Sequence, residues 1–179
     1  EVGLVAGYPE PSVTIGEEEE FADRCFCDFE FEGVWVGLVP AAADPRRTWD
    51  LKQFAKAADE IVQLVEGRGI LLGTETERDV LDEVEGLMRT NPVNFCGQAN
   101  IFQAAALLRR CRLMVSVNTG LMHLGASVGV KIVALMFEDS PLWRPWGEGH
   151  QVLTGLAGSG SPEALKVEEV VRAAKKILS

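Results

Sequence analysis

Short apolar runs alternate with segments of helical periodicity along most of this chain, and no other feature narrows the fold as much. The runs are rich in β-branched residues and apolar at consecutive positions, which is typical of strands buried on both faces. They cover residues 34–39, 70–72, 93–96, 113–117, 131–136 and 151–153. Strands of this kind that alternate with helices form parallel sheets covered on both sides. The sequence therefore predicts an α/β fold, a Rossmann-like doubly wound parallel sheet of about six strands.

Capping pairs mark where several of the helices begin. A short polar residue followed three positions later by Glu or Gln satisfies amides that the first turn of a helix leaves without partners. The pairs are Asp50 with Gln53, Thr74 with Glu77, and Asn100 with Gln103. Acidic residues 17–20 open a further short helix that ends near residue 26, and apolar residues at helical spacing predict a last helix that ends at Leu178.

Composition and charge narrow the functional class. The chain has 179 residues, 47% of them hydrophobic, which is enough for one well-filled core. Its formal net charge of -10 argues against a nucleic-acid surface, so an anionic ligand would need a local basic pocket. No apolar run is long enough to cross a bilayer, and no basic-then-apolar leader is visible, so we expect a cytoplasmic protein. The four cysteines lack the spacing of a zinc site, and we expect reduced thiols and no metal.

The apolar run at 113–117 leads directly into a polar turn and a helix. Asn118, Thr119 and Gly120 form the turn, and His123 lies on the first turn of the helix. A strand that enters a helix in this way presents free N–H groups and the positive end of the helix dipole, which together favour a phosphate. The same residues are also compatible with a plain cap and turn, and His123 with a core histidine on an apolar face.

Loops that follow parallel strands all lie at one edge of a doubly wound sheet, and ligands bind there where the winding reverses. Arg46 and Arg47 follow the first predicted strand and Glu75 follows the second, so we expect them near Thr119. Guanidinium groups and a helix end suit a diphosphate, whereas a carboxylate suits a ribose diol. The two arginines are equally compatible with a solvated surface pair.

The motif Val-Ser-Val-Asn-Thr-Gly-Leu-Met-His-Leu-Gly-Ala at 115–126 resembles the Asp-Ser/Thr-Gly-x-x-His-Leu-Ala-Ala signature of glycosyltransferase family 9, the heptosyltransferases of lipopolysaccharide synthesis. Four other segments resemble further motifs of that family, and they occur in the same order along the chain. They are Arg-Arg-Thr-Trp at 46–49, Gly-Thr-Glu at 73–75, Phe-Cys-Gly-Gln at 95–98 and the segment with Pro and Pro-Trp-Gly at 141–147. The resemblance runs from about residue 34 to the C-terminus.

The resemblance implies a GT-B glycosyltransferase with two Rossmann-like halves, of which this chain would be the C-terminal half. Residues 1–33 would be the interdomain linker with its short helix, and residues 34–179 the nucleotide-sugar-binding domain. The donor would be ADP-heptose, transferred with inversion and without metal or cofactor. A missing N-terminal half would supply the catalytic base and bind a glycolipid acceptor, which would place the full-length protein peripherally at the inner membrane. The isolated chain would be inactive.

Roles for individual residues also follow from the resemblance. Arg47 would stabilise the leaving diphosphate, Glu75 would bind the ribose, and Thr119 and Gly120 would bind phosphate. The residues that would bind the donor are Arg46, Glu75, Asn118, Thr119, Gly120 and His123.

The chain departs from the family pattern in three places. Asn118 stands in place of Asp, Arg47 in place of Lys, and the three alanines at 41–43 replace a loop that usually carries Ser or Thr. Asn118 and the alanines favour a second hypothesis, a non-catalytic nucleotide-binding or interaction module that has lost donor chemistry. The retained Thr-Gly-x-x-His and the two arginines oppose it. A nucleotide-sugar epimerase of related architecture is a third hypothesis, which needs further catalytic carboxylates.

Overall fold

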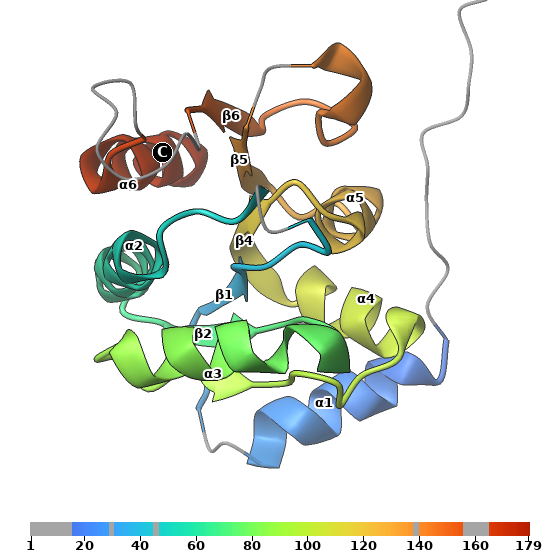
Figure 1. Ribbon diagram of the computed structural model, residues 1–179. Helices are drawn as coiled ribbons and strands as arrows, with labels where there is room; N and C mark the ends of the chain where they lie inside the picture. The colour runs from blue at the N-terminus through green and yellow to red at the C-terminus, as the bar shows by residue number, and fades with distance from the viewer. Residues whose placement is uncertain (1–15, 29–30, 45–46, 138–139, 156–164) are drawn as a thin grey trace, which may run out of the picture.

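One parallel sheet lies between two layers of helices in the computed structural model, which describes residues 16–28, 31–44, 47–137, 140–155 and 165–179 (Figure 1). The strands are β1 (Trp35–Val39), β2 (Arg68–Leu71), β3 (Val93–Asn94), β4 (Cys111–Val117), β5 (Ile132–Met136) and β6 (Gln151–Thr154). Their order is β3-β2-β1-β4-β5-β6, and every neighbouring pair is parallel. The predicted fold class is confirmed.

Three of the described α-helices lie on each face of the sheet. One face is covered by α2 (Leu51–Leu64), α3 (Arg78–Leu87) and α6 (Val167–Leu178), and the other by α1 (Glu18–Asp28), α4 (Ile101–Arg109) and α5 (Gly120–Ser127) (Figure 1). Two short 3-10 helices, η2 (Glu75–Glu77) and η3 (Pro141–Trp143), lie in loops. Among the described helices, none combines the length and the apolar character needed to span a bilayer.

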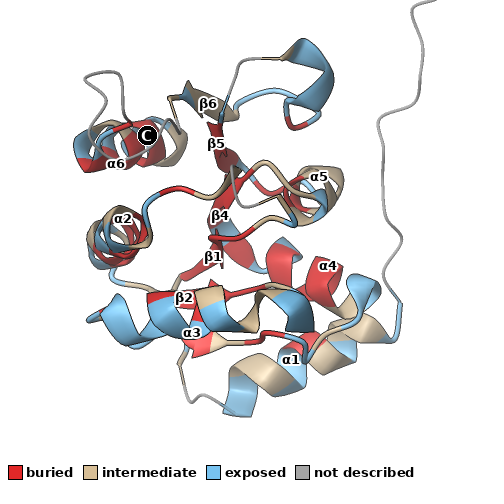
Figure 2. Ribbon diagram, in the orientation of Figure 1, coloured by how far each residue is buried: buried red, intermediate tan, exposed pale blue. Residues whose placement is uncertain are grey.

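The core consists of two apolar clusters, one on each side of the sheet. Phe54 and Ile61 of α2 pack with Val170 of α6 in the first cluster, and Leu107 and Met122 belong to the second. Strands β1 and β5 are buried along their whole length and β4 is buried except at Arg112, in line with the consecutive apolar residues (Figure 2). Burial of both faces is what holds the strand ends, and the loops after them, in fixed positions.

Helix α1 packs on the domain instead of standing apart from it. Ala22 is fully buried in the second cluster. Glu19 pairs with Arg109 and Arg110 of α4 at 3.1 and 2.8 Å, and Asp23 pairs with Arg110 at 2.7 Å. The boundary that we predict between residues 33 and 34 therefore has a well-anchored helix on its N-terminal side.

The capping predictions hold with one difference. Asp50 accepts a hydrogen bond from the Gln53 amide at the start of α2, and Asn100 with Gln103 forms a complete capping box at α4. The Thr74–Glu77 pair opens η2, and α3 begins only at Arg78. This tighter turn determines how Glu75 projects from the loop after β2.

Candidate functional site

The winding of the sheet reverses between β1 and β4, the two central strands. In sheets of this kind, ligands bind in the crevice outside the carboxyl ends of the strands at that point. A cavity of about 690 Å³ opens there, and the loops that follow β1, β2, β3 and β4 all contribute to its lining. Its size is within the range of cavities that hold small organic ligands and cofactors.

The cavity has an apolar wall and a polar rim. The wall consists of strand-end and helix side chains, among them Leu72, Phe95, Ile101, Ala104, Leu121 and Leu124. The rim carries Thr74, Glu75, Asn100 and Thr119. An apolar wall beside a few convergent polar groups can bind a flat base and orient the polar part of the same ligand.

Three of the predicted site residues line this cavity: Glu75, Thr119 and Gly120. Thr119 precedes α5 with an extended backbone, and its carbonyl accepts the Met122 amide at 3.1 Å, while its side chain makes no capping bond. Apart from its chain neighbours and the backbone of its own helix, no described heavy atom lies within 4 Å of the place that a Cβ on Gly120 would occupy. A ligand can therefore approach the start of α5 closely, as a phosphate must to reach the amides there.

The other predicted residues are not brought into the lining. Asn118 is partly buried, and so is His123, whose imidazole pKa is lowered by burial. Neither lines the cavity, and His123 is not enclosed in the core. Arg47 belongs to the loop that contributes Ala43 to the cavity, but its own side chain does not line it. Arg46 falls outside the described residues.

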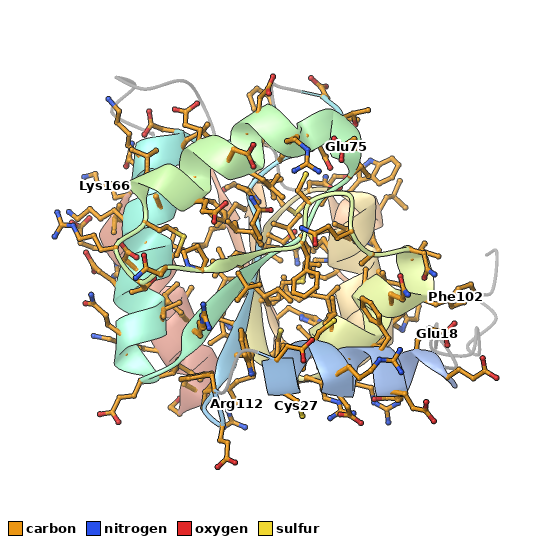
Figure 3. The ribbon with its side chains drawn as sticks, turned by 90° about the horizontal axis from the view of Figure 1, so that it is seen from below. Glu18, Cys27, Glu75, Phe102, Arg112 and Lys166 are labelled. Carbon is orange, nitrogen blue, oxygen red and sulfur yellow. The ribbon has the colours of Figure 1, made fainter. Side chains whose placement is uncertain are left out.

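Glu75 is held by an arginine that we did not predict. Arg78 Nε donates to Glu75 Oε1 at 2.6 Å, and Arg78 Nη2 donates to Glu75 Oε2 at 2.5 Å. The hydrogen bonds from Arg78, which outweigh desolvation, lower the pKa of the Glu75 carboxyl and keep it ionised. Figure 3 shows Glu75 where η2 leads into α3. The spacing of three residues, typical of neighbours on a helix surface, was the only signal for this pair in the sequence.

Gly97 brings the loop after β3 against this carboxylate. It adopts φ +66°, and a Cβ at this position would collide with Glu75 Oε2. The backbone of residues 95–97 and the Glu75 side chain thus form one continuous corner of the cavity. The turn at Gly97 follows from the sequence, whereas its contact with Glu75 depends on side-chain placement.

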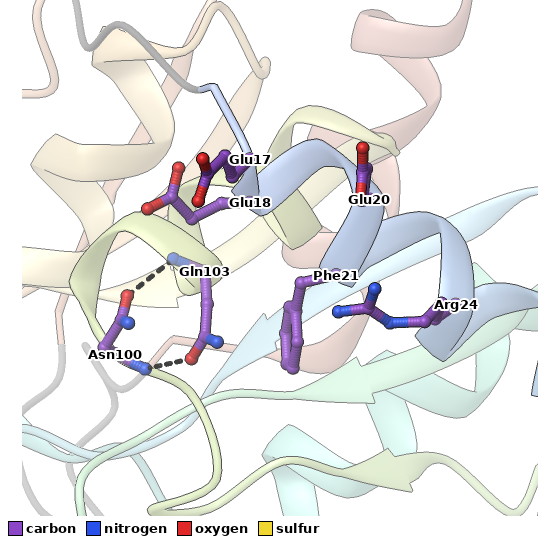
Figure 4. Close-up of a pocket in the computed structure, with 7 residues that line it drawn as sticks. All are labelled: Glu17, Glu18, Glu20, Phe21, Arg24, Asn100 and Gln103. Carbon is purple, nitrogen blue, oxygen red and sulfur yellow. Dashed lines mark hydrogen bonds between the residues drawn. The ribbon is translucent and has the colours of Figure 1, made fainter.

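A second hollow, of about 440 Å³, lies between α1 and α4 (Figure 4). Three glutamates at 17, 18 and 20 line it together with Arg24 and the capping pair of α4, whose two hydrogen bonds are drawn in the figure. The loops after β1 and β4, where the winding of the sheet reverses, contribute no residue to the lining of this hollow. The cavity at the carboxyl edge is therefore the candidate site.

Heptosyltransferases resemble this chain in sequence, and solved structures resemble it in fold. The family described as Glycosyltransferase family 9 (heptosyltransferase) matches residues 3–170. Lipooligosaccharide heptosyltransferase 2 of Haemophilus ducreyi is 30% identical over 133 residues, which cover 70% of this chain and 38% of that protein. Lipopolysaccharide heptosyltransferase 2 of Escherichia coli is 25% identical over 144 residues, 77% of this chain and 40% of that protein.

Two solved structures have a similar fold. The glycosyl transferase family 9 structure from Veillonella parvula matches with a TM-score of 0.85 at 24% identity, over 93% of this chain and 53% of that one. The E. coli ADP-heptose lps heptosyltransferase II matches with a TM-score of 0.83 at 22% identity, over 98% of this chain and 55% of that one. The chain thus spans about half of these structures and less of the curated relatives. With the family matched over nearly its whole length, this chain belongs to glycosyltransferase family 9, the heptosyltransferase family.

Proposed function

We propose that this chain is the donor-binding half of a heptosyltransferase, with ADP-heptose as the donor. The observation that carries the proposal is the cavity at the reversal of the sheet, where Glu75, the start of α5 and an apolar wall face one space. The apolar wall would hold the adenine, Glu75 the ribose, and Thr119 with Gly120 the diphosphate. The names of two related structures, the heptosyltransferase II above and a heptosyltransferase with ADP, support this donor.

The reaction we propose is inverting transfer of the heptosyl group. An acceptor hydroxyl attacks the anomeric carbon opposite the diphosphate, the bond from that carbon to the diphosphate oxygen breaks, and the electron pair leaves with ADP. The hydroxyl proton passes to a base on an N-terminal half that also binds a glycolipid of the lipopolysaccharide core at the membrane surface. The α5 amides would meet the charge that grows on the departing diphosphate, and Arg47, which lies outside the lining of the cavity, would add its charge from the loop after β1.

Calorimetric titration of the chain with ADP, UDP and GDP tests donor binding. We expect ADP to bind most tightly, and Glu75→Gln to weaken ADP by about tenfold, because a hydrogen bond to a charged group is lost. Glu83→Gln is the matched control, since Glu83 is exposed on α3 and does not line the cavity. No nucleotide binding at millimolar concentration, by a chain whose circular dichroism shows it folded, would refute the proposal.

A second candidate, a non-catalytic module, is favoured by two specific positions. Ala43 lines the cavity with no hydroxyl to offer, and Asn118 brings no charge to the turn before α5. Asn118→Asp separates the candidates. In a working donor site the added carboxylate changes nucleotide affinity measurably, whereas in a module without donor chemistry the affinity stays near zero in both forms.

A further inference from the structure

Arg78 joins two walls of the cavity without facing it. It is the first residue of α3 and makes a two-point contact with the Glu75 carboxylate from η2. Its Nη2 also donates to the Cys96 carbonyl, in the loop after β3, at 3.0 Å. The side chain of Glu75 lines the cavity, and that of Arg78 does not. Arg78 is therefore placed to act on a ligand only through Glu75.

The two-point contact leaves half of the carboxylate free for a ligand. An ionised carboxylate offers about four lone-pair positions, and a guanidinium fork uses one on each oxygen. One position remains on each oxygen, which matches two neighbouring hydroxyl groups that both donate. The Glu75 side chain is 68% exposed, so a ligand can reach it.

Gly97 limits the carboxylate from the other side. Glu75 Oε2 lies so near to Gly97 that it would collide with a Cβ there, so the carboxylate rests against the backbone of the loop to which Arg78 is also bonded. A long side chain that would otherwise sample several rotamers is thus held in one orientation at the edge of the cavity.

We propose that Arg78 is a positioning residue for ribose recognition. It holds the Glu75 carboxylate so that the remaining lone pairs accept the 2′ and 3′ hydroxyls of the nucleotide. The inference rests on the proposed function, because it requires that the cavity binds a ribonucleotide. It goes further by naming the residue that makes the site select ribose over deoxyribose.

Calorimetric titration with ADP and 2′-deoxy-ADP tests this role. We expect the wild-type chain to bind ADP about tenfold more tightly than 2′-deoxy-ADP, since one hydrogen bond to a charged acceptor is lost. In Arg78→Gln the ratio falls to about twofold or less, mainly because ADP binds more weakly. Arg109→Gln is the matched control, since Arg109 also pairs with a glutamate, Glu19, away from the cavity, and it leaves the ratio unchanged.

Two further variants separate positioning from general stability. Glu75→Gln removes the same discrimination, and combined with Arg78→Gln it lowers the ratio no further, because both residues act through one contact. Arg78→Lys keeps the charge but not the fork, so it restores only part of the ratio. Thermal melting of every variant shows that the comparison is made between folded proteins.

The outcomes are distinct. A wild-type chain that binds no ADP overturns the proposed function together with this inference. Equal binding of ADP and 2′-deoxy-ADP by the wild-type chain leaves nucleotide binding intact and overturns ribose recognition by Glu75. Discrimination that survives in Arg78→Gln, with Glu75→Gln having removed it, overturns the role of Arg78 alone. Loss of discrimination in both variants supports it.

Discussion

The charge state of Glu75 is set by one neighbour. Hydrogen bonds from Arg78 lower the pKa of this carboxyl, and desolvation, which opposes them, is the smaller effect. We expect Arg78→Gln to raise the pKa of Glu75 toward that of an unpaired glutamate, because the fork that favours the charged form is gone. A side-chain carbon NMR titration measures this directly. An unchanged pKa would mean that the pair does not persist in solution.

Gly97 is a second position at which a single added atom, a Cβ, would disturb the site. Alanine there would be strained at φ +66° and would push against Glu75 Oε2. We expect Gly97→Ala to lower the free energy of unfolding by about 1–3 kcal/mol and to weaken ADP binding as well. Gly86→Ala is the control, since Gly86 lies within α3 with open space around it, and this change should stabilise by about 0.5–1 kcal/mol. Denaturant unfolding of both variants shows whether the loss of stability is specific to the contact between Gly97 and Glu75.

At the scale of elements, the sequence predicted the strands and most helix starts because both leave local signals. Continuous apolar runs marked the six strands, and capping pairs marked α2 and α4. Glu75, Thr119 and Gly120 were found because residues at the ends of parallel strands must share one edge. Arg78 and the apolar wall were missed because which side chains turn toward that edge depends on packing. Arg47 and His123 show the converse, since position in a loop or helix did not bring either into the lining.

The joint between α2 and α3 depends on one buried carboxylate. Asp59 of α2 is 8% exposed and accepts hydrogen bonds from the Arg89 and Thr90 amides and from Thr90 Oγ1, the last at 2.7 Å. It therefore fixes the chain just after α3.

We expect Asp59→Ala to lower the free energy of unfolding by about 2–4 kcal/mol, because it leaves three donors at a partly buried site without their acceptor. Glu83→Ala, which removes an exposed carboxylate from α3, should change it by less than about 0.5 kcal/mol. Equal effects of the two substitutions in urea unfolding would show that the hydrogen bonds to Asp59 add nothing to the stability of the fold.

At the scale of the whole molecule, the segment between β5 and β6 is tied to the sheet by a histidine. His150 Nδ1 accepts the Ile132 amide at 3.1 Å, and Nε2 donates to the Trp146 carbonyl at 2.8 Å. Only the neutral imidazole can do both, because the charged ring has two donors and no acceptor. Burial, the largest cause, lowers the pKa of His150, and burial also lowers that of His123.

The sign of the pH dependence follows from these lowered pKa values. The histidines of the unfolded chain become protonated at about pH 6.5, the ordinary histidine value, whereas those of the folded chain become protonated only at lower pH. Stability from the neutral rings is therefore complete above that pH and is lost as the pH falls below it. We expect the free energy of unfolding to decrease between pH 7.5 and 5.5, and the decrease to be smaller in His150→Gln. The double variant with His123→Asn should flatten it further. A decrease in this pH range that is the same in the wild-type chain and both variants would assign it to carboxylates and not to the two histidines.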